Sequence, residues 1–389
     1  MKESNGNPQL IRSINERRIL QLILGQPTLS RAEISRLTGL SKPTVSAAVK
    51  SLLELGLIEE IGQGSAGAGR KPTLVRFAAA SHHVLGVQLG ADRLRLVLAN
   101  LQADRILEAS CSIDSLPGSP SELLPSIRSE ADRLLARAGT RWDQIGCAAF
   151  AIPGVVGPRG EVSMLAPHLQ GCEPALARTS LAEHFPCPVT ADNDVNLAAL
   201  AEYAVHRGHE DDVFAFLFLD SGIGAGIMTG GRLLRGLGGA AGELGDMRLA
   251  DGRRLEDRLS EQALLDRART SLQPSGPSQL GQPGSLTLDG LFAAVAAGDP
   301  QARQALAGYA EELAGAVHNL TALLAPQRIV LGGRIGEQQA LLHAVRPLLD
   351  ERLSVSPQLD AASLGSESVL TGALQSAARA TMTHIEESL

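Results

Sequence analysis

The sequence has few cysteines and no long hydrophobic run. Its four cysteines form neither a C-x-x-C pair nor a cluster within 389 residues, which argues against disulfides and against a thiolate metal site. The most apolar stretch, VFAFLFL at 213–219, is far too short to cross a bilayer and is typical of a buried strand. The N-terminal MKESNGNPQLIRS lacks the apolar core of a signal peptide. We therefore expect a cytoplasmic globular protein with no membrane partner.

Lysine is absent from most of the chain. All four lysines lie within residues 1–80, where 11 Lys and Arg face 6 Glu, a formal charge of +5; the rest carries 24 basic against 36 acidic residues, or −12. A basic N-terminal segment followed by an acidic remainder is typical of a nucleic-acid-binding module joined to a domain that does not bind nucleic acid. An arginine-rich proteome gives a similar imbalance, so charge alone does not decide between these interpretations.

Residues 15–54 predict a helix-turn-helix. A first helix over NERRILQLIL is followed by SRAEISRLTGLSKPTVSAAVKSLLELG. Ser30 and Glu33 form a capping box that starts the second helix, Gly39 makes the sharp turn, and Ser41 caps the third helix. The face of the second helix that we expect to be buried consists of Ala32, Ile34 and Leu37.

In such an arrangement the first residues of the third helix face the DNA major groove. The candidates are small or basic: Lys42, Thr44, Ser46 and Lys50. The next stretch, GLIEEIGQGSAGAGRKPTLVRF, predicts a strand, a glycine-rich tip and a strand, with Arg70 and Lys71 placed to contact phosphates or the minor groove. Helical hairpins also serve as protein-contact modules, but the predicted wing favours DNA.

The remaining residues predict a mixed α/β body with an internal repeat. A strand, a glycine corner and a second strand occur in HHVLGVQLGADRLRLVL and again in VFAFLFLDSGIGAGIMTGG. This repetition indicates two similar lobes, about 81–193 and 194–389, that face a cleft. The Pro-, Gly- and Ser-rich segment 271–285 is typical of a flexible loop within the second lobe.

The chain resembles the ROK family of repressors, open reading frames and sugar kinases, and specifically its repressor branch. The resemblance covers nearly the whole chain through the ordered motifs NERRILQLI, SRAEISRLTGLSKPTVS, GAGRKPTL, ADNDVNLAALAE, DSGIGAGI, AGELGD and IVLGGRI. It implies an α/β fold class: a winged helix-turn-helix at 1–80, then a two-lobed actin-like ATPase fold at 81–389. It further implies a C-terminal helix that packs back on the first lobe, a sugar in the cleft, and a homodimer or homotetramer.

The kinase members of this family hold nucleotide phosphates and magnesium at the glycine corners, and three residues here depart from that pattern. Gln88 replaces the aspartate that helps to organise the metal, and a neutral amide is a poor substitute because Mg²⁺ prefers charged oxygen ligands. Asp220 replaces a glycine that approaches the phosphates, and we expect it to repel them. Arg334 stands where a small residue lines the adenine pocket. We therefore expect no phosphoryl transfer, no catalytic residue and no cofactor.

The sugar-binding side of the resemblance is better retained. Asn193 and Asp194 match the family's N-D-x-N corner, where the asparagine binds sugar hydroxyls and the aspartate is the catalytic base; both residue types are also ordinary helix caps. Glu243 matches a second sugar-contacting carboxylate, with a solvated loop glutamate as the alternative. His168 stands where family members often carry an asparagine at the edge of the cleft, although a lone histidine is also a common surface residue. We expect these four residues to bind the ligand.

The zinc loop of the family is missing. Family members follow that glutamate with a histidine ligand and with three cysteines in C-x-C-G-x-x-G-C-L-E. Here Asp246 replaces the histidine, no cysteine follows, and the loop is shorter until RLEDRLS resumes the match. We expect no bound metal, because the four ligands of a zinc site are not present. The histidine also contacts sugar in the family, so its loss leaves the affinity for sugar open.

The sequence thus predicts a DNA-binding transcriptional regulator, a repressor of carbohydrate-metabolism genes. Its predicted partners are operator DNA and a sugar or sugar-derivative effector that it does not phosphorylate. One alternative is an active sugar kinase with a fused DNA-binding head, which Gln88 and Asp220 oppose. The other is a ligand-blind DNA-binding scaffold, which the missing histidine and zinc loop favour.

Overall fold

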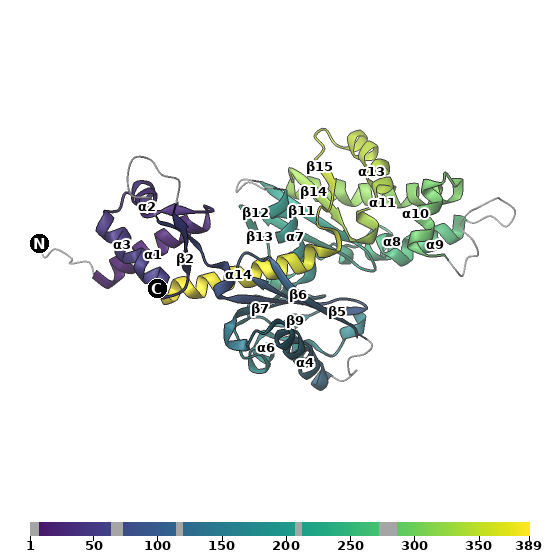
Figure 1. Ribbon diagram of the computed structural model, residues 1–389. Coiled ribbons are helices and arrows are strands. Elements are labelled where there is room, and N and C mark those ends of the chain that lie inside the picture. The colour runs from purple at the N-terminus through teal and green to yellow at the C-terminus, as the bar shows by residue number, and fades with distance from the viewer. Residues whose placement is uncertain (1–7, 64–72, 114–119, 207–211, 272–285) are drawn as a thin grey trace, which may run out of the picture.

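The structure is a computed structural model that describes residues 8–63, 73–113, 120–206, 212–271 and 286–389. A small helical domain lies at one end, and two larger α/β bodies lie at the other (Figure 1). A single long C-terminal helix connects them (Figure 1). Within these ranges no helix is long and apolar enough to cross a membrane.

The small domain is a winged helix. Its elements are α1 (Pro8–Leu24), β1 (Leu29–Ser30), α2 (Arg31–Thr38), α3 (Lys42–Glu54), β2 (Ile58–Gln63) and β3 (Thr73–Phe77). The strands form an antiparallel sheet in the order β1-β3-β2. The predicted capping box of Ser30 and Glu33 is confirmed, and Gly39 ends α2 with a φ of +70°, which glycine adopts without strain. The buried face of α2 differs from the prediction: Ile34 and Thr38 are buried, whereas Ala32 is exposed and Leu37 is 50% exposed.

The first α/β body, called lobe 1, is built on a five-stranded sheet in the order β10-β7-β4-β5-β6. Its strands are β4 (His83–Leu89), β5 (Arg93–Asn100), β6 (Arg105–Ser112), β7 (Ile145–Ile152) and β10 (Val189–Asn193). Its helices are α4 (Pro120–Ala138), α5 (Glu173–Leu176) and α6 (Arg178–His184), and a small hairpin joins β8 (Val155–Val156) to β9 (Val162–Ser163). Antiparallel β4–β5–β6 pairing gives way to parallel pairing of β4, β7 and β10.

The second body, called lobe 2, repeats this plan in a sheet of order β13-β12-β11-β14-β15. Its strands are β11 (Val213–Leu219), β12 (Ile223–Thr229), β13 (Arg232–Leu233), β14 (Arg328–Gly332) and β15 (Gln358–Ala361). Its helices are α7 (Asp194–Val205), α8 (Glu256–Leu259), α9 (Glu261–Ser271), α10 (Leu288–Ala296), α11 (Pro300–Leu324), α12 (Gly333–Gly336) and α13 (Gln339–Arg352). An antiparallel hairpin is again followed by parallel strands, as the internal repeat predicts. Residues 272–285, the predicted flexible loop, lie outside the described residues.

The last helix, α14 (Ser368–Ser388), packs on β4 and β7 of lobe 1 and on α7, and then continues to the winged helix (Figure 1). Glycines permit the close packing. A side chain at Gly372 would collide with the carbonyl of Leu197 on α7, and a side chain at Gly146 on β7 would collide with Thr381. Because no larger residue fits at these positions, α14 lies directly against both elements.

Candidate functional site

The start of α3 is the candidate DNA-reading surface. Ser41 caps this helix, because its Oγ accepts a hydrogen bond from the Thr44 amide (3.3 Å) and lies 2.8 Å from the Thr44 hydroxyl. Lys42, Ser46 and Lys50 are exposed, whereas Thr44 is half-buried. Lys50 pairs at 3.6 Å with a glutamate one turn further along, so part of its charge is engaged within the helix. Lys42, Ser46 and Lys50 are therefore all accessible on this surface, and Lys42 and Ser46 make no ion pair or side-chain hydrogen bond within the described residues.

The base of the wing carries arginines that are already paired. Arg76 on β3 binds Glu59 on β2 at 2.7 Å, and Arg31 on α2 binds Glu60 at 3.2 Å. The first pair joins the two strands of the wing and the second joins β2 to α2, so both arginines have part of their charge neutralised at the base of the wing. The two predicted contacts of the wing tip, Arg70 and Lys71, lie outside the described residues.

The polar corner between β10 and α7 is held by Asn193. Its Oδ1 caps α7 by accepting a hydrogen bond from the Asn196 amide (3.0 Å), and its Nδ2 donates to the carbonyl of Gly154 (3.0 Å). The capping role that the sequence left open is therefore present. Because an amide oxygen accepts two hydrogen bonds and an amide nitrogen donates two, Asn193 keeps capacity for a ligand while its orientation is fixed.

Asp194 and Glu243 lie near enough to each other for the charge of Glu243 to act on the pKa of Asp194. Burial raises the pKa of Asp194 to about 7, and the charge of Glu243 adds to this shift against a 2.8 Å hydrogen bond from the Val195 amide. Burial likewise raises the pKa of Glu243, with further contributions from Asp246 and Glu256. Within the described residues, no hydrogen bond engages the Glu243 side chain. Both carboxylates are thus poised to accept hydrogen bonds from a polar ligand.

The glycine corners of the two lobes show how the nucleotide side is altered. The Oε1 atom of Gln88 is buried and has no hydrogen-bond partner among the described atoms. Arg334 donates to Asp220 from Nε (3.1 Å), from Nη2 (2.8 Å) and from its own amide (3.0 Å), and it also pairs with Glu261. Asp220 is therefore a paired carboxylate, which corrects the expectation that it acts as a free charge repelling phosphates. The feature that the structure shows at this corner is an ion-paired bridge from Arg334 to Asp220 and Glu261.

Comparison with known proteins agrees with this arrangement. Residues 84–380 match the ROK family. The chain belongs to the ROK family. Residues 12–59 match a winged helix-turn-helix DNA-binding family, so the predicted order of a winged helix and a ROK body is confirmed. Among relatives, the xylose repressor of Caldicellulosiruptor bescii is 26% identical over 362 residues, which cover 89% of this chain and 90% of that protein.

Solved structures share the fold. A ROK family transcriptional regulator, a homologue of the Escherichia coli Mlc protein, matches with a TM-score of 0.80 at 24% identity, covering 97% of this chain and 98% of that one. A ROK family glucokinase from Streptomyces griseus, in complex with glucose and AMPPNP, matches with a TM-score of 0.65 at 21% identity, covering 76% and 99%. The same ROK body therefore occurs both with and without a winged helix.

Arginine ion pairs occupy the ROK loop in which the resemblance implies zinc ligands. Arg254 lies within 3.5 Å of three carboxylates, those of Asp246, Glu256 and Asp257. Asp251, in the same loop, binds Arg253 and Arg258, and the hydrogen bond from Arg258 is the largest cause of its lowered pKa of about 2. Within the described ranges, no cluster of three His, Cys, Asp or Glu side chains has the arrangement of a metal site.

Two parts of this site were missed by sequence reasoning. Asp192, which is buried, binds Arg235 through both carboxylate oxygens (2.9 and 2.7 Å) and so joins the end of β10 to the segment after β13. Glu256 reaches back from α8 to the second glycine corner, where its Oε2 lies 3.4 Å from the Ile223 amide. Its position in RLEDRLS, where the family match resumes, was the signal for Glu256. The Asp192–Arg235 pair has no comparable local signal.

His168 is not drawn into the carboxylate group. It lies on a short 3-10 helix, Pro167–Leu169, which follows the β8–β9 hairpin, whereas Gly154, whose carbonyl binds Asn193, precedes that hairpin. Its side chain is exposed and makes no hydrogen bond or ion pair within the described part of the chain. Its assignment as a ligand-binding residue therefore stays a prediction.

Proposed function

We propose that this protein is a transcriptional regulator that binds operator DNA through its winged helix and a sugar or sugar derivative through its ROK body, without phosphorylating the sugar. One observation carries the proposal: a winged helix precedes a ROK body whose second glycine corner is bridged by Asp220 and Arg334. The relative in Caldicellulosiruptor bescii, a xylose repressor, makes repression of carbohydrate-metabolism genes the preferred direction of control. A cytoplasmic homodimer or homotetramer is the assembly that we propose.

The proposed sugar site is the corner formed by Asn193, Asp194 and Glu243. Sugar hydroxyls both donate and accept, and they pair well with carboxylate oxygens and an oriented amide. Glu243 lacks a protein partner for its carboxylate within the described residues, and burial raises the pKa of both acids. A ligand hydroxyl that donates to these groups would replace the water that burial removes, which favours binding.

The proposed absence of kinase activity rests on the nucleotide side. Phosphoryl transfer depends chiefly on metal and phosphate positioning, which a general base alone does not supply. Gln88 offers no carboxylate to a metal, and the guanidinium of Arg334 is committed to Asp220 and Glu261. The retained Asp194, with a pKa of about 7, is what an active kinase would need as a base, so kinase activity is the second candidate function.

A thermal-shift screen followed by a DNA mobility-shift assay tests the proposal. D-Xylose is the first probe, followed by D-glucose, N-acetylglucosamine and their 6-phosphates. We expect at least one of these to raise the melting temperature saturably and to change the affinity for operator DNA selected from random sequence. An ATP-consumption assay with the same sugars separates the two candidates. Turnover above that of an Asp194→Asn control would establish the kinase.

A further inference from the structure

A buried carboxylate anchors the segment that leads from lobe 2 into α14. Glu202, on α7, is fully buried and accepts hydrogen bonds from the amides of Ser363 (2.9 Å) and Leu364 (2.8 Å) and from the hydroxyl of Ser368 (3.1 Å). A buried carboxylate is costly unless its oxygens are satisfied, and the two amide bonds satisfy them and fix the segment. The Ser368 hydroxyl shares its single hydrogen between Glu202 and the carbonyl of Gly365 (2.6 Å). Because α7 packs on β11 and β12, the anchor belongs to lobe 2.

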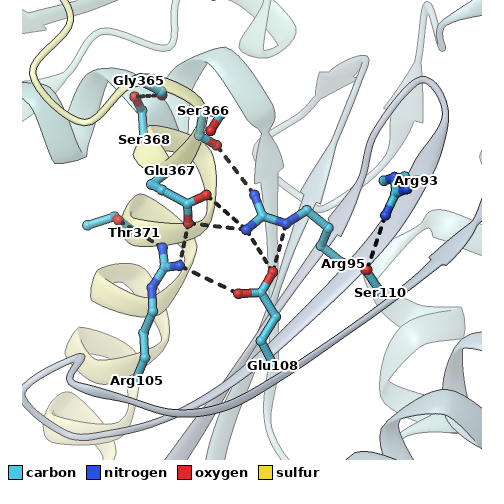
Figure 2. Close-up of polar contacts among 10 residues, drawn as sticks. All are labelled: Arg93, Arg95, Arg105, Glu108, Ser110, Gly365, Ser366, Glu367, Ser368 and Thr371. Atoms are coloured by element: carbon cyan, nitrogen blue, oxygen red, sulfur yellow. Dashed lines mark hydrogen bonds and ion pairs between the residues drawn. The ribbon is translucent and has the colours of Figure 1, made fainter.

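An ion-pair cluster holds the same segment from the side of lobe 1 (Figure 2). Arg95, on β5, binds Glu367 (2.9 Å) and Glu108 on β6 (2.7 Å). Arg105, at the start of β6, also pairs with Glu367, and its second contact is Glu108 at 3.7 Å. Burial opposes the ionisation of Glu367, but hydrogen bonds from Arg105 and Arg95 outweigh it and lower the pKa of Glu367.

The two anchors interleave in the sequence. The Leu364 amide and the Ser368 hydroxyl are held from lobe 2, and the Glu367 side chain, which lies between them, is held from lobe 1. Any rotation of one lobe against the other must therefore distort residues 363–368 or break one anchor, and it must also shift the contact between α14 and α7. Short segments between elements absorb such rotations in other two-lobed proteins.

From this segment α14 runs to the winged helix (Figure 1). Its 21 residues span about 31 Å at the helical rise of about 1.5 Å per residue. At the far end, the Ser13 hydroxyl of α1 donates to the carbonyl of Leu389 (2.7 Å), and Gln21 of α1 lies 3.5 Å from Glu386. Ile385 also packs against the core that includes the buried face of α1. The helix therefore contacts the DNA-binding domain directly.

We propose that residues 363–368 are a hinge, that the cluster of Arg95, Arg105, Glu108 and Glu367 is a latch that fixes α14 to lobe 1, and that α14 carries lobe movement to the winged helix. The role of the hinge in regulation rests on the proposed function. An effector bound beside Asp194 would shift the equilibrium between two lobe arrangements only if it bound one arrangement more tightly than the other. The latch residues Arg95, Arg105 and Glu367 act through α14 and are positioning residues.

Hydrogen exchange in the full-length protein, without sugar or DNA, tests this coupling. The variant is Glu367→Gln, which removes the charge that holds α14 but leaves Glu108 to satisfy both arginines. The matched control is Arg93→Ala: Arg93 lies on the same strand as Arg95 and hydrogen-bonds Ser110 within the sheet (3.4 Å; Figure 2). Exchange is followed at the segment itself, at residues 378–389 and in α1.

We expect Glu367→Gln to raise exchange at residues 378–389 and in α1 by roughly fivefold, the scale of a partly exposed charge cluster, while Arg93→Ala leaves both unchanged. Wild-type protein at 1 M salt, where the Debye length is about 3 Å, should show the same rise. Because the salt experiment uses the wild-type protein, it tests the latch even if Glu367→Gln does not fold. A rise confined to residues 362–371, or an equal rise in the control, would overturn the hinge. Because neither sugar nor DNA is needed, this result is independent of the proposed function.

Discussion

Arg334 and Asp220, 114 residues apart in the sequence, are joined by hydrogen bonds from the guanidinium and from the Arg334 amide. The pair joins the start of α12 to the end of β11 and bridges the second glycine corner, where the family resemblance implies that kinases present glycine backbone to the nucleotide. Each residue alone departs from the kinase pattern, and together they satisfy one another. The corner is thus a structural contact, and the ligand site that we propose lies on the opposite, carboxylate-rich side.

DNA binding by the winged helix should depend strongly on salt. Replacing Arg70 and Lys71 with alanine should weaken binding to all sequences and reduce the slope of log K against log[salt] by about 2, because each lost phosphate contact removes about 1. Ser46→Ala should instead change sequence preference, since Ser46 is exposed at the start of α3. Mobility shifts over a salt series measure both effects. Equal operator binding by an isolated body of residues 81–389 would contradict this assignment.

The stability of the protein should depend on pH through the raised pKa of Asp194. The folded-state pKa of about 7 lies above the ordinary value of 3.8, so folding takes up a proton between these pH values, and the contribution of Asp194 to stability falls as pH rises through that window. Asp194→Asn removes this cost. The variant should therefore melt above the wild type at pH 8, with a smaller difference at pH 5. Asp289→Asn, at an exposed site in α10, is the control; a pH-independent difference for Asp194→Asn would refute the buried, uncharged state.

Sugar binding should depend on Glu243. Glu243→Ala should lower sugar affinity at least about tenfold, a loss of about 1.4 kcal/mol, and so remove the thermal shift at moderate sugar concentration. Binding to operator DNA in the absence of sugar should be unchanged. Glu122→Ala, at an exposed position in α4, is the matched control. A full thermal shift in Glu243→Ala would move the ligand site away from this corner.

Local signals in the sequence predicted local structure well. The capping box at Ser30 and the left-handed Gly39 follow from short-range hydrogen bonding and backbone sterics, and both are present. The buried face of α2 was predicted less well: Leu37 is exposed because an eight-residue helix buries only the residues that its neighbours cover. Periodicity gives a helix an apolar face, but the packing partner selects which residues of it are buried.

Long-range pairs were not predictable from a single sequence. Asp192 and Arg235 are 43 residues apart, and no periodicity or spacing links them. The same holds for Asp220, which sequence reasoning treated as a free charge, because the lobe fold determines which arginine it meets. Asn193 and Glu243 were selected through a family resemblance and not through a local pattern of the sequence. The tertiary fold thus determines which charged residues of the site pair with each other, and a single sequence does not show those pairs.

The loop that follows Glu243 should hold no zinc and should instead depend on ion pairs. Elemental analysis should find no stoichiometric zinc, and a chelator should leave the melting temperature unchanged, because Arg254 occupies the loop with three carboxylate partners. Arg254→Ala should lower the melting temperature more at low salt than at high salt. The nearly fully exposed Arg159 provides an Arg159→Ala control. One tightly held zinc ion per chain would show that the loop has been misassigned.

Restoring one kinase residue should not create a kinase. Gln88→Asp supplies a carboxylate for a metal, but Arg334 and Asp220 still bridge the second glycine corner. A general base such as Asp194 contributes only about 10²–10⁴-fold, whereas phosphoryl transfer needs the phosphates and metal in position. We therefore expect no ATP-dependent phosphorylation of any sugar that the protein binds, in the wild type or in Gln88→Asp. The triple variant Gln88→Asp, Asp220→Gly, Arg334→Gly removes all three departures from the kinase pattern. Its phosphorylation of sugar is compared with that of Gln88→Asp alone. Phosphorylation by Gln88→Asp alone, above an Asp194→Asn background, would show that the bridge does not block the nucleotide.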